Sequence, residues 1–281
     1  MNTVCNVFRK GRALLHGVAN PAVEAKVLLL LATGISEVEF LASVTRGVSG
    51  REERRFLRLI EKRLSDVPLA YITGRKEFWS RTFKVGPGVL IPRPETELIV
   101  EKVLELSSGG EETIVDIGTG SGNIAVALAG ELPRAQIIAT DVSAKALKFA
   151  RLNAKTNRVE RIAIAAGNLF APLKKLQLEG KCDFITSNPP YVSAPDWEKL
   201  PGEVRDCEPR VALFGGKSGL EFIRRLIRGA TLYLKPGGYL LFETGEGQAE
   251  AALSLFDHHW AKPQVADDLR GIPRLVIAAK A

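Results

Sequence analysis

After Pro94 the chain alternates short apolar segments that predict β-strands with segments that predict helices, and this alternation restricts the possible folds most strongly. The predicted strands comprise residues 113–117, 136–140, 184–187, 239–243 and 275–279. The predicted helices comprise residues 95–106, a segment that begins after Gly122, and residues 144–154. This alternation indicates an α/β fold in which helices cover a mostly parallel sheet and ligands bind at the carboxyl ends of the strands.

The first third of the chain predicts helices without intervening strands. Asn20 and Pro21 are typical of a helix start, and an apolar segment continues from them to Gly34. A second helix is predicted over residues 52–64, where apolar side chains form one stripe and basic side chains occupy the other faces. This part of the chain therefore predicts a small helical domain.

Extended segments separate the helical part from the α/β part. Residues 78–85 alternate and are rich in aromatic and β-branched side chains, and Gly86-Pro87-Gly88 is typical of a turn before a short second run at residues 89–91. Residues 76–91 thus predict a hairpin or a pair of extended segments. We expect a helical domain over residues 1–75, a hairpin or linker over residues 76–93 and the larger domain over residues 94–281.

Composition excludes several classes of protein. Hydrophobic residues make up 46% of the chain and charged residues 25%, which is typical of a globular protein. The apolar run at residues 27–32 is far shorter than the ~20 residues that a membrane helix needs, and no secretory signal is apparent. Cys5, Cys182 and Cys207 are odd in number and lack nearby histidines, which argues against disulfides and zinc. We expect a cytoplasmic protein without a membrane segment or metal centre.

The basic excess of the chain lies in its first part. The formal charge is +7; residues 1–84 hold 15 basic and 8 acidic side chains, whereas residues 85–281 hold 24 of each. The basic side chains of residues 52–64, among them Arg54, Arg55 and Arg58, form either a solvated helix face or a docking surface. The charge balance of the larger part disfavours a nucleic-acid substrate, which usually needs a basic cleft.

A glycine-rich segment follows the first predicted strand of the α/β part. It reads Gly118-Thr119-Gly120-Ser121-Gly122, and glycines there allow a tight turn and close approach of the backbone to a nucleoside. A dinucleotide fingerprint would require glycine at position 123, which is Asn123 here, so NAD and FAD are disfavoured. Asp141 ends the second strand, where a carboxylate can accept hydrogen bonds from both ribose hydroxyls. A glycine turn with a helix-capping aspartate is the alternative interpretation.

The tetrapeptide Asn188-Pro189-Pro190-Tyr191 directly follows the predicted strand 184–187, so it lies at the ligand-binding edge. The prolines restrict the backbone, which would hold the Asn188 side chain and the Pro189 carbonyl in a stiff arrangement. These two acceptors can receive both protons of one planar NH2 group, while Tyr191 can stack on its plane. The tetrapeptide therefore predicts a site for an amide or aromatic amine, and a proline-rich turn is the structural alternative.

These features together resemble the class I S-adenosylmethionine-dependent methyltransferases, in the branch that methylates an amino group on an sp2 carbon. The flanking residues resemble the peptide chain release factor glutamine N5-methyltransferases, the PrmC/HemK family. The similarity comprises residues 68–74, 78–79, 91–97, 208–210, 212–216, 219–220, 235–238, Glu243, Gly245, Gln248, residues 268–271 and Arg274. It implies a Rossmann-like methyltransferase sheet with a small N-terminal helical domain joined by a hairpin.

The resemblance assigns roles by position. It implies that S-adenosylmethionine, which leaves as S-adenosylhomocysteine, contacts Gly118, Thr119, Gly120, Ser121, Gly122, Asp141, Asn168, Leu169 and Asn188. It implies that Asn188, Pro189, Pro190 and Tyr191 bind the substrate amide, with Asn188, Pro189 and Tyr191 catalytic. At the adenine the family usually has an acidic residue followed by an aromatic one, whereas this chain has Asn168 and Leu169. An amide can still hydrogen-bond the ring amine, and leucine can pack on its face.

The resemblance also implies the substrate, which is the glutamine of the Gly-Gly-Gln motif in class 1 release factors. Arg93, Glu95 and Glu97 are candidates for closing the site, and ordinary capping and surface charges are the alternative. The basic N-terminal helices are candidates for holding the body of the release factor. Three other functions stay open: a ribosomal-protein glutamine methyltransferase, a DNA or RNA amino-methyltransferase, and a non-catalytic binding module.

Overall fold

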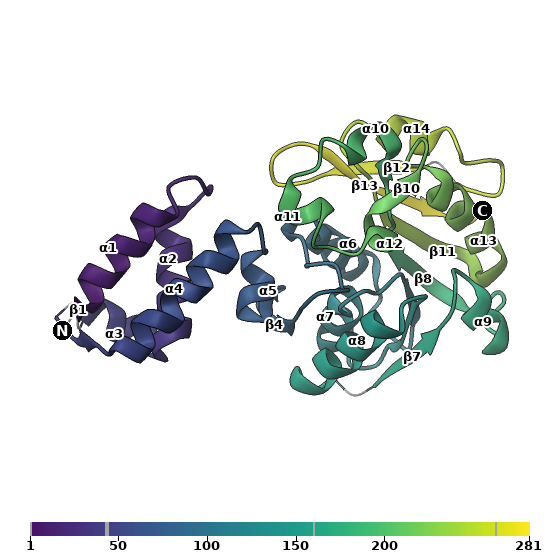
Figure 1. Cartoon of the computed structure of the whole chain (residues 1–281). Helices are drawn as coiled ribbons and strands as arrows, with labels where there is room; N and C mark the ends of the chain where they lie inside the picture. Colours follow the sequence, from purple (N-terminus) through teal and green to yellow (C-terminus); the bar gives the residue numbers. More distant parts are fainter. Residues whose placement is uncertain (1, 43–44, 160, 262) are drawn as a thin grey trace. The chain divides into compact units, whose positions relative to one another are not determined.

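The computed structural model describes residues 2–42, 45–159, 161–261 and 263–281 (Figure 1). The chain forms two compact units. One comprises the chain up to Gly74 together with Gly202–Cys207, and the other comprises Arg75–Pro201 and Glu208–Ala281. Within the described ranges no helix is both long enough and apolar enough to cross a membrane.

The N-terminal unit is helical, with α1, α2 and α4 packed against one another (Figure 1). Its elements are β1 (Asn2–Thr3), α1 (Val4–Leu14), α2 (Pro21–Thr33), α3 (Glu37–Ala42), β2 (Gly47–Val48), α4 (Gly50–Leu64), α5 (Leu69–Thr73) and α11 (Gly202–Arg205). Helix α4 begins with a capping box formed by Ser49 and Glu52. Phe56 on α4 packs so closely on Gly11 that a Cβ at Gly11 would lie 2.2 Å from its ring. A small residue is therefore required where α1 and α4 meet.

The larger unit begins with a hairpin and continues as an α/β domain. Its elements are β3 (Arg75–Phe78), β4 (Arg81–Lys84), η1 (Pro94–Thr96), α6 (Glu97–Leu106), β5 (Thr113–Ile117), α7 (Asn123–Glu131), β6 (Gln136–Asp141), α8 (Ala144–Thr156), β7 (Ile162–Ala166), α9 (Ala171–Lys175), β8 (Cys182–Ser187), β9 (Val192–Ser193), α10 (Ala194–Trp197), α12 (Arg210–Leu213), β10 (Phe214–Gly216), α13 (Glu221–Tyr233), β11 (Leu234–Glu243), α14 (Ala249–Leu253), β12 (Gln264–Asp267) and β13 (Pro273–Ala279).

Seven strands form one sheet in the order β12-β13-β11-β8-β5-β6-β7. The five strands from β11 to β7 are parallel, while β13 pairs antiparallel with both β11 and β12. The chain runs outward from β5 to β6 and β7 on one side, and from β8 to β11 on the other. The loops that follow β5 and β8 consequently diverge, which leaves a crevice at the carboxyl ends of these two strands.

Apolar side chains cover both faces of the sheet. Along β11, Leu240 and Phe242 belong to a cluster with residues of α9, α13 and α14, whereas Leu241 between them belongs to a cluster with residues of α6, α7 and α8. This alternation follows from the period of two in a strand. Burial on both faces fixes the register of the parallel strands, and therefore also fixes where each strand ends at the crevice.

The predicted hairpin forms, but at a different turn. β3 pairs with β4 around Trp79 and Ser80, whose φ angles are +50° and +52°, whereas residues 89–91, which follow Gly86-Pro87-Gly88, form no strand. A two-residue hairpin turn with both φ angles positive matches strand twist, and tertiary contacts can impose it on residues other than glycine. Phe78 and Phe83 are buried in the core of the larger unit, which secures this hairpin despite its turn sequence.

A buried carboxyl group lies in the centre of the sheet. Asp116 of β5 is fully buried, and its Oδ1 accepts a hydrogen bond from Thr186 Oγ1 of β8 at 3.2 Å. Burial, together with the nearby charge of Asp141, raises the pKa of Asp116 to about 6. A carboxyl whose pKa is higher in the folded state than in the unfolded state stabilises the fold below the unfolded pKa. That stability is lost as the pH rises through the folded value.

We expect Asp116→Asn to remove this pH dependence. Between pH 4 and pH 7.5 the wild type should lose up to about 3 kcal/mol of unfolding free energy that the variant does not lose. The variant should therefore become more stable relative to the wild type as the pH rises. Urea unfolding of both proteins at the two pH values measures the shift. A difference that stays constant with pH would contradict the burial of an ionisable Asp116.

Candidate active site

The crevice at the carboxyl edge of the sheet contains a cavity of about 670 Å³. The loops after β5, β6, β7 and β8 supply one part of its wall, and residues 88–96, residues 209–216 and α13 supply the rest. The predicted site residues that line this cavity are Gly118, Thr119, Gly120, Ser121, Asp141, Asn168, Leu169, Asn188 and Pro190. Segments from four strand ends are thus brought to one site.

The glycine segment folds into a tight loop at the end of β5. Gly118 and Gly120 have φ angles of +73° and +56°, a region that side chains with a Cβ rarely adopt. The backbone N–H groups of Gly118 and Thr119 both donate to the carbonyl of Thr140 at 2.9 Å. A Cβ at Gly118 would meet no atom within 4 Å, so the absence of a side chain leaves space open at the loop.

A buried asparagine holds the loop in place from behind. Asn153 of α8 donates from Nδ2 to the carbonyl of Ser121 at 2.8 Å and to the carbonyl of Lys84 at 3.0 Å. Its Oδ1 accepts from the backbone N–H of Lys84 at 2.6 Å. A single side chain therefore joins the hairpin to the glycine loop, a contact that the sequence pattern did not identify.

Gly122 lies just outside the residues that line the cavity. It has a φ of +83° at the start of α7, and a Cβ there would lie 3.1 Å from Ala150 of α8. Close packing of two helices explains this glycine. Its contact with a cofactor stays a prediction.

Asp141 is fixed at the cavity wall by backbone donors. Its Oδ2 accepts from the N–H of Gly120 at 2.9 Å, and its Oδ1 accepts from the N–H of Ser143 at 2.8 Å. Burial raises the pKa of Asp141, while these backbone hydrogen bonds oppose the rise. Each carboxylate oxygen retains further lone pairs, so both can also accept from a diol.

The segment after β7 supplies the two residues that depart from the family pattern. Leu169 is buried with a φ of +48°, an uncommon conformation for leucine, and it lines the cavity together with Asn168. A Cβ at Gly167 would lie 2.7 Å from Pro172, so this segment requires glycine at its start. The backbone places an amide and an apolar side chain at the position that the sequence predicted for adenine.

Asn188 follows β8 and lies between two cavities. It lines the large cavity, and it also lines a second cavity of about 20 Å³ with Pro189 and Tyr191. The Nδ2 group of Asn188 donates to Thr96 Oγ1 at 2.9 Å. The four residues of the tetrapeptide are therefore divided, with Pro190 at the large cavity and Pro189 and Tyr191 at the small one.

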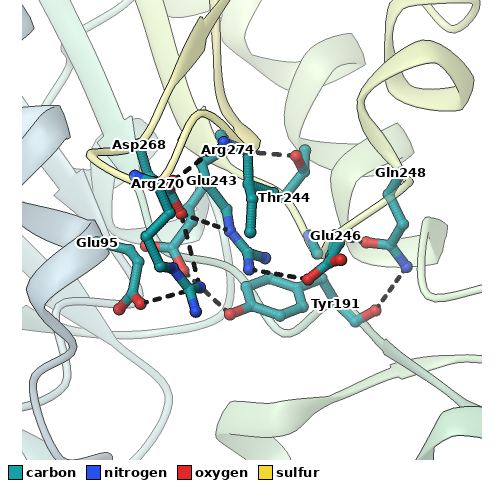
Figure 2. Close-up of polar contacts among 11 residues, drawn as sticks. Glu95, Tyr191, Glu243, Thr244, Glu246, Gln248, Asp268, Arg270 and Arg274 are labelled. Atoms are coloured by element: carbon teal, nitrogen blue, oxygen red, sulfur yellow. Dashed lines mark hydrogen bonds and ion pairs between the residues drawn. The ribbon is translucent and has the colours of Figure 1, made fainter.

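Tyr191 is held at both ends by residues that follow β11 or end it (Figure 2). Its hydroxyl donates to Glu243 Oε1 at 3.0 Å, and its carbonyl accepts from Gln248 Nε2 at 2.9 Å. Burial and the adjacent Glu243 carboxylate raise the pKa of Tyr191 well above its ordinary value of 10. The phenol consequently stays neutral at physiological pH, and its ring is fixed against the small cavity.

The three residues considered for closing the site lie in different surroundings. Arg93 lines both cavities, and its guanidinium pairs with Glu208 at 2.5 Å. Glu97 accepts from the backbone N–H of Trp79 at 2.7 Å, and Glu95 pairs with Arg270 at 3.4 Å (Figure 2). The two acidic residues therefore support neighbouring segments, whereas Arg93 lies at the site.

Some residues at the site were not identified as functional from the sequence pattern. Arg210 lines the large cavity and stacks over Phe214 and Trp197, at 4.6 Å and 5.2 Å from the ring centroids. Arg225 of α13 lines the same cavity. Glu243 ends β11 at the ligand-binding edge, and its position after an apolar strand was the signal that could have indicated it.

The residues present fit S-adenosylmethionine. The cavity is large enough for a nucleoside with an amino-acid tail, since ligand pockets range from about 300 to 1,000 Å³. Gly118 leaves open space at the loop, and the fixed carboxylate of Asp141 suits a ribose diol. Asn168 offers an amide at the wall for a base.

Comparisons with known proteins agree with this geometry. The family model described as Methyltransferase small domain matches residues 94–199, and the model described as PrmC N-terminal domain matches residues 6–74. A release factor glutamine methyltransferase from Moorella thermoacetica is 42% identical over 95% of this chain and 94% of its own length. A protein of the same name from Geobacter sulfurreducens is 40% identical over 96% of this chain and 93% of its own length.

A solved structure shows the same fold. The crystal structure of a methyltransferase from Pyrococcus furiosus aligns with a TM-score of 0.51 and 20% identity, over 81% of this chain and 98% of the other. The larger unit thus has the class I methyltransferase fold. With two relatives at 40% identity or more over nearly their whole length, the chain belongs to the release factor glutamine methyltransferase family.

Proposed function

We propose that this protein transfers the methyl group of S-adenosylmethionine to the side-chain amide nitrogen of the glutamine in the Gly-Gly-Gln motif of class 1 release factors. The reaction would take place in the cytoplasm and would modulate translation termination. Methylation of a release-factor glutamine agrees with the family to which the chain belongs. The family name does not specify the Gly-Gly-Gln motif or the cytoplasm, so these two parts of the proposal go beyond it.

The observation that carries the proposal is the placement of Asn188 between the two cavities. The large cavity has the volume and the fixed polar groups for the cofactor, and the small one is bounded by Asn188, Pro189 and Tyr191. The small cavity has room for about one water molecule, so it marks the place beside the cofactor site from which a glutamine amide would reach Asn188. Asn188 lines both cavities, and its side chain offers an amide oxygen to the substrate.

The chemistry of an amide explains why hydrogen-bond acceptors are needed where the substrate meets the cofactor. The lone pair of an amide nitrogen is delocalised, so the nitrogen is a poor nucleophile, and positive charge develops on it as a new bond to carbon forms. The Asn188 side-chain oxygen and the Pro189 carbonyl can accept hydrogen bonds from its two N–H groups and stabilise that charge. Tyr191 fixes the amide plane by stacking. The cofactor supplies the electrophilic methyl group.

Positioning supplies much of the remaining rate enhancement. Asp141 and the glycine loop would hold the cofactor, and the rigid tetrapeptide would hold the amide in line with the methyl group. No strong general base is needed, because the N–H becomes acidic once the nitrogen is alkylated and its proton can pass to solvent water. The charge balance of residues 85–281 suits a neutral amide better than a polyanionic nucleic acid.

We expect purified release factor to incorporate labelled methyl when it is incubated with this protein and labelled S-adenosylmethionine. Asn188→Ala should lower kcat about 100- to 1,000-fold, since removal of one preorganised group at a site of developing charge has this effect. Asn157→Ala, an asparagine outside both cavities, is the matched control and should leave the rate unchanged.

Mass spectrometry should place the label on the motif glutamine, and a release factor with that glutamine replaced should stay unlabelled. Label on ribosomal proteins or on nucleic acid in the same assay, with none on release factor, would contradict the proposal. Full activity of Asn188→Ala would contradict the role of Asn188.

The basic side chains of α4 are proposed to hold the body of the release factor. Arg54, Arg55 and Arg58 are exposed on α4. We expect their combined reversal to Glu to raise the KM for release factor about tenfold at low salt and less at high salt, since surface charges contribute about 0.5 kcal/mol each. The affinity for S-adenosylhomocysteine should not change.

Reversal of Lys174, Lys175 and Lys181, three exposed basic residues of the larger unit that do not line either cavity, provides the matched control. The control should leave KM unchanged. An unchanged KM in the α4 variant would show that this helix face is only solvated. An equal rise in both variants would show a general effect of charge without a docking surface.

A further inference from the structure

A chain of two hydrogen bonds, one half-buried and one buried, joins Asn188 to Glu243. Asn188 Nδ2 lies 2.9 Å from Thr96 Oγ1, and Thr96 Oγ1 lies 2.6 Å from Glu243 Oε2. Thr96 and Glu243 are only 1% and 3% exposed. The three residues come from the end of β8, from η1 and from the end of β11, so three separate segments meet behind the amide of Asn188.

The chemistry of the three groups fixes the direction of the protons. An ionised carboxylate only accepts hydrogen bonds, and a threonine hydroxyl has a single proton to donate. The Thr96 proton is therefore committed to Glu243, and Thr96 offers only lone pairs to Asn188. The amide of Asn188 must then present its NH2 group to Thr96, which leaves its oxygen for the other side.

The opposite orientation of the amide is unfavourable. It would bring the Asn188 oxygen against the Thr96 oxygen with no proton between them, in a buried environment where an unsatisfied acceptor is costly. It would also turn the NH2 group of Asn188 toward the substrate. Two NH2 groups would then face each other, and neither could accept.

We propose that Thr96 and Glu243 are positioning residues that hold the Asn188 amide in the single orientation that presents its oxygen to the NH2 group of the substrate. This inference rests on the proposed function, because it specifies how the same site recognises an amide nitrogen. It assigns roles to two residues outside the tetrapeptide, neither of which needs to contact the substrate.

Two hydroxyl donors and the nearby Arg274 guanidinium favour the ionised, accepting form of Glu243 at the end of this chain. Figure 2 shows Arg274 beside Glu243, where it pairs with Asp268 at 3.3 Å and with Glu246 at 3.5 Å. Burial raises the pKa of Glu243, but the hydrogen bonds from Thr96 and Tyr191 and the charge of Arg274 oppose the rise, while Glu95 adds to it. The same carboxylate also accepts from the Tyr191 hydroxyl at 3.0 Å. One acidic group consequently orients two walls of the small cavity.

A pair of substitutions at Thr96 separates hydrogen bonding from packing. Thr96→Val keeps the shape of the side chain but removes the hydroxyl, whereas Thr96→Ser keeps the hydroxyl and removes a methyl group. With release factor as substrate, Thr96→Val should lower kcat about 10- to 100-fold, because the amide loses the partner that sets its orientation. Thr96→Ser should stay within about threefold of the wild type, and both variants should bind S-adenosylhomocysteine within about threefold of it.

The orientation of the amide is measured without substrate by NMR of ¹⁵N-labelled protein. The Asn188 side-chain NH2 signals, identified by their loss in Asn188→Ala, should exchange slowly with solvent in the wild type and in Thr96→Ser. They should exchange at least tenfold faster in Thr96→Val. Unchanged exchange in Thr96→Val overturns the inference.

Kinetics and NMR together distinguish the two hypotheses. A wild-type protein that transfers no methyl to release factor refutes the proposed function, and the exchange measurement then still tests the orientation. Equal losses of kcat in Thr96→Val and Thr96→Ser would show that Thr96 only packs, which overturns the inference while leaving the function intact. An unchanged kcat in Thr96→Val overturns it as well.

Discussion

The divergence of the chain after β5 and β8 is the constraint on which the site depends. These two strands are neighbours in the middle of the sheet, and the chain leaves them toward opposite edges. The glycine loop and the tetrapeptide therefore start next to each other and separate, which opens the cavity between them. Burial on both faces fixes the register of the strands, so it also fixes the distance between the groups that would hold the cofactor and the substrate.

Polar groups held by hydrogen bonds then give the crevice its specificity. Asp141 is held by two backbone N–H groups, and Glu243 is held by the hydroxyls of Thr96 and Tyr191. In both cases burial raises the pKa of the carboxyl, while hydrogen bonds favour its charged form. Hydrogen bonds hold each acid in one position, so Asp141 keeps its remaining lone pairs directed at the cavity and Glu243 keeps Thr96 and Tyr191 in place.

The sequence predicted the elements whose signals are local. The strand over residues 113–117 has the predicted bounds, and helix α8 extends two residues past its predicted end. Strands β7 and β12 were not predicted; both are sheet edges that are largely half-buried or exposed, and β7 contains three alanines in five residues, so neither shows a strong β pattern. The hairpin turn was placed at Gly86-Pro87-Gly88 because the actual turn, Trp79-Ser80, lacks the usual residues.

The residues of the candidate site also fall into those with a local sequence signal and those without one. Glycines, prolines and strand-end residues act locally, so their positions in the sequence indicated the tetrapeptide, the glycine loop and Asp141. Thr96 and Glu243 meet only in the folded chain, 147 positions apart, and Asn153 meets Lys84 across 69. Contacts of this kind depend on the packing of distant segments, and no local pattern predicts them.

In the proposed reaction, Asn188 and Pro189 accept the two protons of one amide group. A crystal structure of the protein with S-adenosylhomocysteine and a peptide containing Gly-Gly-Gln would show whether both acceptors contact the glutamine. The glutamine nitrogen should lie within about 3.2 Å of both the Asn188 side-chain oxygen and the Pro189 carbonyl oxygen. A glutamine whose oxygen faces Asn188, or whose nitrogen lies beyond about 4 Å from both acceptors, would contradict the account.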